Sequence, residues 1–317
     1  MKVNRKGAVI MEFLHNEYKI PSATGVADIY VQCIAPDAEP TAIIQVIHGM
    51  AEHTDRYIDV ANYFAAAGFA VFMSDHAGHG KSITTNDDLG YFGETDGDKH
   101  LAEDAAAVTK LAKQTYPGKK VILWGHSMGS FVTRNYLARK LETVDGAVIC
   151  GTAGANPAAG AGVLVANLIA KVKGSKYRSP FINSLAFGAY NKKFAGRTDF
   201  DWLSVDEKNI DVYIADPKCG YLFTATAYRD LFKLLAAVSD KKSFADTPKD
   251  IPLYLIAGDM DPVGNFGKGV TEVYNNFKAA GCNVSCKLYE GLRHEIHNET
   301  VKKEVWEDIL SFARSVL

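Results

Sequence analysis

The stretch Val121–Ser130, which reads VILWGHSMGS, is the most informative segment of this sequence for the fold. Four apolar residues, the pattern of a buried strand, run directly into Gly-His-Ser-Met-Gly, where Ser127 stands between Gly125 and Gly129. Residues 128–141 then follow the pattern of an amphipathic helix. A serine between two glycines at a strand-to-helix turn matches the G-x-S-x-G nucleophile elbow. We therefore predict that Ser127 is a catalytic nucleophile.

The elbow explains why these residue types occur together. The turn holds the serine in strained backbone geometry, and side chains two positions away would collide with the neighbouring strand and helix, so glycine fits both places. The N-terminus of the following helix directs backbone N–H groups at the same point and favours negative charge there. The simpler alternative is an ordinary turn with a serine that only caps the helix.

Short apolar segments alternate with amphipathic ones along much of the chain. Continuous apolar strands separated by helices predict an α/β fold, with a mostly parallel sheet covered by helices on both faces. The expected strands are residues 29–34, 42–47, 69–74, 121–124, 146–151, 253–257 and 284–289. The expected helices are residues 58–67, 101–115, 128–141, 267–280 and 299–316.

This alternation breaks between residues 155 and 245, where the sequence is helical and aromatic-rich without a convincing strand. We predict that 155–245 is a helical cap over the carboxyl edge of the sheet, inserted between core segments 1–154 and 246–317. One helical face in this region collects apolar residues and is expected to meet the substrate through Leu164 and Leu168. The other members of that face are Val165, Ile169 and Val172.

Composition narrows the classes of function. The 317 residues contain 35 lysines and arginines and 37 acidic residues, a net charge of −2, which argues against a nucleic-acid binder. Five scattered cysteines do not suggest a disulfide framework and favour a reducing compartment. No uninterrupted apolar run reaches the ~18 residues that a membrane span needs. We expect a cytoplasmic protein, and its oligomeric state stays open.

A serine nucleophile needs a base, and the base needs an acid to orient it. On this type of sheet they follow in the order serine, aspartate or glutamate, histidine, after later strands. The segment GDMDPVG after strand 253–257 offers Asp259 and Asp261, and EGLRHEIHNE after strand 284–289 offers His294 and His297. We prefer Asp261, which precedes a proline in a turn, and His294, which is closer to its strand.

The oxyanion formed during acyl transfer needs two backbone N–H donors. One is expected from Met128, the residue after the nucleophile, and the other from Met50, in the loop HGMAEHTDRY after strand 42–47. Gly49 lets the backbone of this loop approach the substrate closely. His126, next to the nucleophile, is expected to shape the site rather than to move protons.

Several motifs together resemble the α/β-hydrolase branch that contains monoacylglycerol lipases and lysophospholipase-like serine hydrolases. They are HGMAEHTDRY, DHAGHGKS, GHSMGS, GDMD and YEGLRHEIHNE, and the resemblance runs from about residue 25 to the C-terminus. It implies Ser127 as nucleophile, Asp261 as orienting acid, His294 as base, and a cap that shapes an acyl tunnel. The sequence departs from this branch at Ala51 and Ser130, where the family usually has glycine.

These observations lead us to expect a serine hydrolase that cleaves esters of single-acyl lipids, either monoacylglycerols or lysophospholipids. No cofactor and no metal are implied, since His76 and His79 have no third ligand cluster in the sequence. The basic run KVKGSKYR beside the apolar cap helix suggests transient contact with an anionic membrane surface. Two alternatives stay open: a short-chain esterase, amidase or aminopeptidase-like hydrolase with the same triad, and a non-catalytic ligand-binding protein.

Overall fold

The computed structural model describes residues 2–3, 9–10, 13–194 and 196–317. Eight strands form one sheet in the order β10-β9-β8-β7-β5-β6-β4-β3, with all neighbours from β6 through β5 to β10 parallel. β4 is antiparallel to β6, and β3 is antiparallel to β4. The strands are β3 (Phe13–Ile20), β4 (Ile29–Pro36), β5 (Ala42–Ile47), β6 (Phe69–Ser74), β7 (Val121–His126), β8 (Gly146–Cys150), β9 (Leu253–Gly258) and β10 (Val284–Tyr289). β1 (Lys2–Val3) and β2 (Val9–Ile10) form a separate antiparallel pair.

The central strands are buried on both faces, which is why they appear in the sequence as continuous apolar runs. Every residue of β5, β6, β7 and β8 is buried. All seven strands expected from the sequence are present, and the predicted α/β fold is confirmed. The edge strand β3 was not predicted, because it is mostly exposed and has no apolar run.

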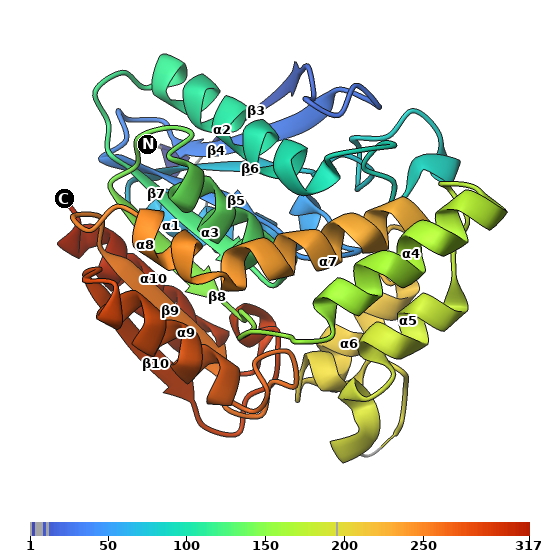
Figure 1. Cartoon of the computed structure of the whole chain (residues 1–317). Helices are drawn as coiled ribbons and strands as arrows, with labels where there is room; N and C mark the ends of the chain where they lie inside the picture. Colours follow the sequence, from blue (N-terminus) through green and yellow to red (C-terminus); the bar gives the residue numbers. More distant parts are fainter. Residues whose placement is uncertain (1, 4–8, 11–12, 195) are drawn as a thin grey trace.

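Helices cover both faces of the sheet (Figure 1). α1 (Ile58–Ala66) and α10 (Lys302–Ser315) share one hydrophobic cluster with the sheet. α2 (Gly97–Thr115), α3 (Met128–Arg139) and α9 (Lys268–Ala279) share the other. Alternate side chains of one strand enter the two clusters. In β5, Ile43 packs in the cluster with α2, α3 and α9, and Ile44 packs in the cluster with α1 and α10. This alternation joins the layers into one core.

The chain between β8 and β9 is helical, and its first part lies beyond the ends of the strands (Figure 1, green to yellow). It contains α4 (Ala159–Lys173), α5 (Pro180–Phe187), α6 (Glu207–Ala215), α7 (Ala225–Ser239) and α8 (Lys241–Asp246). α7 contacts α2 and α3 as well as α4, and α8 contacts α3 and α9. Since α7 and α8 also pack on the core, the boundaries 155–245 for a separate cap stay a prediction.

Helix α4 presents a different face to the protein than the sequence analysis expected. Its buried residues are the small ones, Ala159, Gly162 and Ala166. A Cβ at Gly162 would lie 2.8 Å from the Phe232 ring of α7. The close packing of α4 against α7 therefore requires small side chains at this face, and Leu164, Leu168 and Val172 are left exposed.

None of the described helices is both long enough and apolar enough to cross a membrane. The five cysteines are free thiols, and four of them are buried.

Candidate active site

Ser127 lies between the end of β7 and the start of α3, in the geometry expected of an elbow. Its backbone has φ 53° and ψ −120°, a conformation that residues with a side chain rarely adopt. Its N–H donates to the carbonyl of Cys150 at 2.9 Å, and its carbonyl accepts the Ser130 hydroxyl at 2.6 Å. These two hydrogen bonds hold the strained turn in place.

The glycines on either side are required by close approach. A Cβ at Gly129 would overlap the carbonyl oxygen of Ile47 in β5, and a Cβ at Gly125 would overlap the Thr133 hydroxyl of α3. Backbone cannot yield as a flexible side chain can, so any side chain at Gly129 would push α3 away from the sheet. The elbow thus fixes how strand, helix and serine lie relative to one another.

His294 and Asp261 lie together at the same edge of the sheet. His294 Nδ1 is 2.8 Å from Asp261 Oδ2, and the two side chains are 2% and 0% exposed. Asp261 also accepts the Val263 N–H at 2.8 Å, which holds its carboxylate in position. His294 and Ser127 line one cavity.

The other member of each sequence pair is used elsewhere. The Asp259 carboxylate accepts the N–H of Gly291 at 2.8 Å and so connects the loops after β9 and β10. His297 lies behind the site, fully buried, with its ring stacked on Tyr57 at 5.0 Å between centroids. The geometry therefore favours Asp261 and His294 within their pairs.

The pKa of His294 reflects two opposing effects. Burial disfavours the charged imidazolium, but the charge and hydrogen bond of Asp261 outweigh burial and raise the pKa above its ordinary value. A buried imidazole that readily takes a proton is suited to act as a general base.

The loop after β5 passes directly beside Ser127. A Cβ at Gly49 would lie 3.1 Å from the Ser127 Cβ and 2.6 Å from a Glu52 oxygen, so glycine is needed for this approach. Met50 and Met128 line the cavity with Ser127. Met128 is the first residue of α3, and its N–H has no carbonyl one turn earlier within the helix to accept it. These positions suit the two proposed oxyanion donors.

Ala51 adopts the left-handed conformation, with φ 51°. This explains why the α/β-hydrolases that this sequence resembles usually have glycine here, since glycine occupies the left-handed region without steric cost. Ala51 is held by its N–H on His79 Nε2 at 3.3 Å, and its carbonyl accepts Gly220 N–H at 3.0 Å and the Tyr213 hydroxyl at 3.1 Å.

The cavity has a volume of about 670 Å³ and lies between the elbow and the segment 155–245. It runs from Ser127 and His294 to apolar side chains of α3, α4, α5 and α7, and its apolar walls include Phe131, Val165, Leu185, Phe187, Leu231, Phe232 and Leu235. Trp202 covers the base, with its ring 5.1 Å from that of His294. A cavity of this size is typical of small-molecule sites.

Two predicted contacts are corrected by the structure. Leu164 and Leu168 are 71% and 63% exposed and lie away from the cavity, whereas Gly162 and Val165 of the same helix line it. The small residues of α4 pack inward, so the leucines point outward. The other two residues predicted to meet the substrate, Gly49 and His126, do line the cavity.

A family model described as "Serine aminopeptidase, S33" matches residues 38–301. The chain belongs to this family of α/β-hydrolases. The matched region contains Ser127, Asp261 and His294 together with the whole segment 155–245.

Relatives and solved structures agree with this family. The chain is 30% identical to a monoacylglycerol lipase of Mycolicibacterium smegmatis, over 95% of this chain and 98% of that one. It is 28% identical to human monoglyceride lipase, over 83% of this chain and 78% of that one. A carboxyl esterase from Bacillus coagulans, solved with glycerol, superposes with a TM-score of 0.90 at 30% identity, covering 95% and 98% of the two chains.

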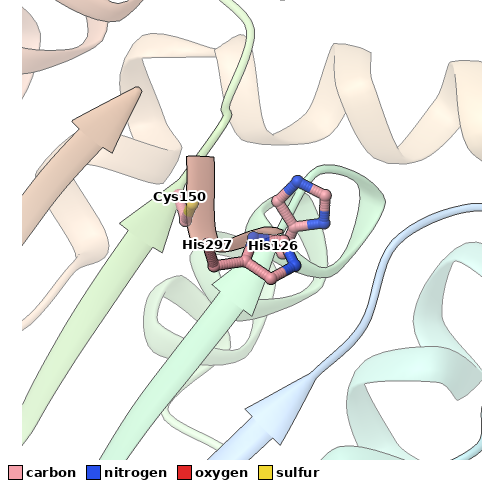
Figure 2. Close-up of side chains that lie close together, drawn as sticks. All are labelled: His126, Cys150 and His297. Atoms are coloured by element: carbon pink, nitrogen blue, oxygen red, sulfur yellow. The ribbon is translucent and has the colours of Figure 1, made fainter. Parts of the chain in front are cut away.

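Two groups of side chains in this α/β-hydrolase have the composition of a metal site. His126, Cys150 and His297 have ligand atoms within 4.8 Å of one another (Figure 2). Within the described part of the chain, both ring nitrogens of His297 are buried without a hydrogen-bond partner. Burial lowers the pKa of His297 and raises that of the Cys150 thiol, so the site favours neutral groups. Tyr57 and Trp124 pack directly on His297, and we assign it to the core.

The second group, His53, Asp216 and Cys219, joins the loop after β5 to the segment after α6. His53 Nε2 lies 2.7 Å from Asp216, and the aspartate also accepts the N–H of Lys218. Because His53 and Asp216 already bond each other, we interpret the group as a contact between the two segments rather than as a metal site.

Sequence reasoning missed a buried charged cluster beside the site, composed of Glu52, Arg56 and Glu295. Its only sequence signal was the position of these residues within the motifs HGMAEHTDRY and LRHEIHNE. Residues so far apart in the chain can be paired only once the fold is known.

Proposed function

We propose that this protein is a serine hydrolase that cleaves carboxylic esters of single-acyl lipids through an acyl-enzyme on Ser127. The observation that carries this proposal is the apolar cavity of about 670 Å³ that leads to Ser127 and to the hydrogen-bonded pair His294–Asp261. Membership of the hydrolase family, and the names of its monoacylglycerol lipase and esterase relatives, support the same reaction.

The steps follow from the roles of these residues. His294 takes the proton of the Ser127 hydroxyl as its oxygen attacks the ester carbonyl, and Asp261 holds the imidazole in the required tautomer. The N–H groups of Met50 and Met128 stabilise the oxyanion. His294 then protonates the leaving alcohol. A water molecule that gives its proton to the same histidine attacks the acyl-enzyme and releases the fatty acid.

The charges around the cavity favour a neutral head group. Among the described residues that line it there is no lysine or arginine, whereas Glu52, Asp199 and Glu295 are acidic. Arg56 lies against Glu52 and Glu295 and is bonded to both. A lysophospholipid would bring its phosphate beside carboxylates without a free cation to pair with it. The glycerol of a monoacylglycerol can hydrogen-bond without this cost.

The outer faces of α4 and α5 suit contact with a lipid surface, from which such a substrate would come. Exposed apolar side chains gather there beside Lys171 and Lys173, and they are Leu164, Leu168, Val172, Phe181 and Leu185. Leu185 also lines the cavity, so this surface lies next to the acyl site. We propose that this face contacts anionic membranes transiently. We also propose a cytoplasmic location, in keeping with the five free cysteines.

Turnover of p-nitrophenyl esters with two, eight and sixteen carbons tests the function, with the wild type and Ser127→Ala compared. Each buried methylene contributes about 0.8 kcal/mol, so six more give at most about 5 kcal/mol in favour of the eight-carbon ester over the two-carbon ester. We expect Ser127-dependent turnover that peaks at eight carbons or above. Monolauroylglycerol and lauroyl lysophosphatidylglycerol carry the same acyl chain and differ in the anionic phosphate, so they then test the head group. We expect the neutral glycerol ester to be hydrolysed faster.

The same series separates the alternatives. A maximum at two carbons would indicate a short-chain esterase or an amidase with a small acyl site. Full activity of Ser127→Ala would refute the mechanism. Absence of turnover, together with failure of a fluorophosphonate probe to label the wild type, would indicate a binding protein without catalysis.

A further inference from the structure

Arg56 is buried between two carboxylates that belong to distant parts of the chain. Its Nη1 donates to Glu52 Oε2 at 2.7 Å and to Glu295 Oε1 at 2.7 Å, and its Nη2 donates to Glu295 Oε2 at 2.6 Å. The three side chains are 7%, 2% and 2% exposed. Burying such charges seldom adds net stability compared with an apolar core, so the cluster calls for another explanation.

Glu52 connects this cluster to the proposed oxyanion loop. Its Oε1 accepts the N–H of Gly49 at 2.6 Å and the Tyr57 hydroxyl at 3.0 Å, and lies 3.2 Å from His126 Nδ1. Burial alone would raise the pKa of Glu52, but the contacts with His126 and Arg56 outweigh it and hold the pKa well below the ordinary value. A charged Glu52 therefore fixes the His48–Gly49 peptide, one peptide before the one that carries the Met50 N–H, beside Ser127.

Glu295 connects the cluster to the proposed base, because it directly follows His294 in the chain. Its two oxygens face the guanidinium of Arg56 as a bidentate pair, which is the more specific geometry for this pairing. Its backbone N–H donates to the carbonyl of Leu203 at 2.8 Å. The His294–Glu295 peptide is thus held at its N–H by the Leu203 carbonyl, while the Glu295 side chain is held by Arg56.

The segment from α6 to Gly220 is attached to the same cluster. Asn209 Nδ2 donates to Glu295 Oε2 at 2.8 Å, and the Tyr213 ring lies 4.9 Å from the Arg56 guanidinium. Tyr213 and Gly220 both donate to the carbonyl of Ala51, in the loop that carries Met50. This part of the predicted cap is therefore bonded to the oxyanion loop, whereas the outer faces of α4 and α5 are exposed.

We propose that Arg56 is a positioning residue that sets the oxyanion loop through Glu52 and the base through Glu295. The segment 207–220 completes this arrangement by packing on it. It follows that this segment stays seated during turnover, and that the substrate enters on the side of α4 and α5. The inference rests on the proposed function, because it assigns a role within that reaction.

The test compares Arg56→Gln, Arg56→Lys and a matched control, Arg229→Gln. Arg229 is also a buried arginine, paired with Asp230 at 2.7 Å, but its partners lie on α7 and before α2, away from the cavity. Measurements are kcat and KM for p-nitrophenyl octanoate, and Tm. A misplacement near 1 Å in an active site costs on the order of 100-fold in rate, so we expect a kcat loss approaching this for Arg56→Gln with KM little changed.

Arg56→Lys keeps the charge but cannot form the bidentate pair, so its kcat is expected between those of the wild type and Arg56→Gln. Arg229→Gln is expected to lower Tm without changing kcat. Equal kcat for Arg56→Gln and the wild type would refute the inference. So would a loss of kcat in Arg229→Gln as large as that in Arg56→Gln, because the effect would then reflect stability alone.

Two further results separate this inference from the proposed function. If the wild type shows no Ser127-dependent hydrolysis, the proposed function fails before the variants are compared. If the wild type is active, the double variant Asn209→Ala, Tyr213→Phe tests the coupling, because it removes the side-chain hydrogen bonds of α6 to Glu295, Arg56 and the Ala51 carbonyl. A severalfold loss of kcat without a change in Tm supports the coupling to segment 207–220. An unchanged kcat in that variant would refute the coupling.

Discussion

The hydrogen bond between Asp261 and His294 provides the sharpest test of the proposed triad. Asp261→Asn preserves size and leaves an oxygen for the Val263 N–H, so the fold should survive. The amide can instead donate to His294 Nδ1, which would place the imidazole proton on Nε2, the nitrogen that must accept from serine. A base in the wrong tautomer cannot remove the proton of Ser127.

The magnitude follows from this geometry. The pair is 2.8 Å apart and at most 2% exposed, so water cannot replace the lost carboxylate. The corresponding change in a well-studied serine protease lowers kcat by about 10⁴, which corresponds to about 5.4 kcal/mol in the barrier. We expect a loss of at least about 10³ for octanoyl ester hydrolysis at neutral pH.

The pH profile gives a second measurement with a definite sign. Asp261 raises the pKa of His294, and only the neutral imidazole accepts a proton, so kcat/KM of the wild type should rise with pH around a midpoint above the ordinary histidine pKa. Without the carboxylate, burial prevails, and the midpoint of the residual activity should move to lower pH. Steady-state kinetics at about ten pH values between roughly pH 5 and 9 would record the profiles of the wild type and of Asp261→Asn.

Asp259→Asn is the matched control, since it lies two residues away and its amide oxygen can still accept the Gly291 N–H. It should retain kcat and the pH profile of the wild type. A large loss of kcat in Asp259→Asn with little loss in Asp261→Asn would refute the assignment of the orienting acid.

Three further predictions concern the elbow, the oxyanion loop and the outer face of α4. Gly129→Ala places a Cβ on the Ile47 carbonyl and should abolish activity and lower Tm. Gly160→Ala is the control, because its Cβ meets no atom within 4 Å, and it should leave activity unchanged and Tm unchanged or slightly raised. Equal behaviour of the two variants would contradict the steric argument. Ala51→Gly relieves about 1 kcal/mol of strain in the left-handed backbone, but it loses a similar amount of stability through chain entropy and a buried methyl group. Its Tm should therefore hardly change. Ala112→Gly within the helix α2 has no strain to relieve, so it should lower Tm. Leu164→Ser with Leu168→Ser should reduce sedimentation with phosphatidylcholine–phosphatidylglycerol vesicles without changing kcat on soluble octanoyl esters, and unchanged vesicle binding would contradict the proposed membrane face.

Much of the sheet could be predicted because its central strands are buried on both faces. Such strands must be continuously apolar, and a local pattern reveals them without knowledge of their partners. The convergence of the serine, the aspartate and the histidine at one edge could be predicted for a related reason. The carboxyl ends of parallel strands meet at one edge, so residues that follow successive strands come together whatever their distance in the chain.

The sequence by itself thus determined the α/β class, the family, and the pairs from which the triad would be drawn. The tertiary structure decided which side of α4 faces inward, because an apolar stripe does not reveal whether a helix packs by its large residues or, as at Gly162 against Phe232, by its small ones. It also decided the contacts of Arg56 with Glu52 and Glu295. A buried charge is tolerated only where its partners converge, and that convergence is a property of the folded chain.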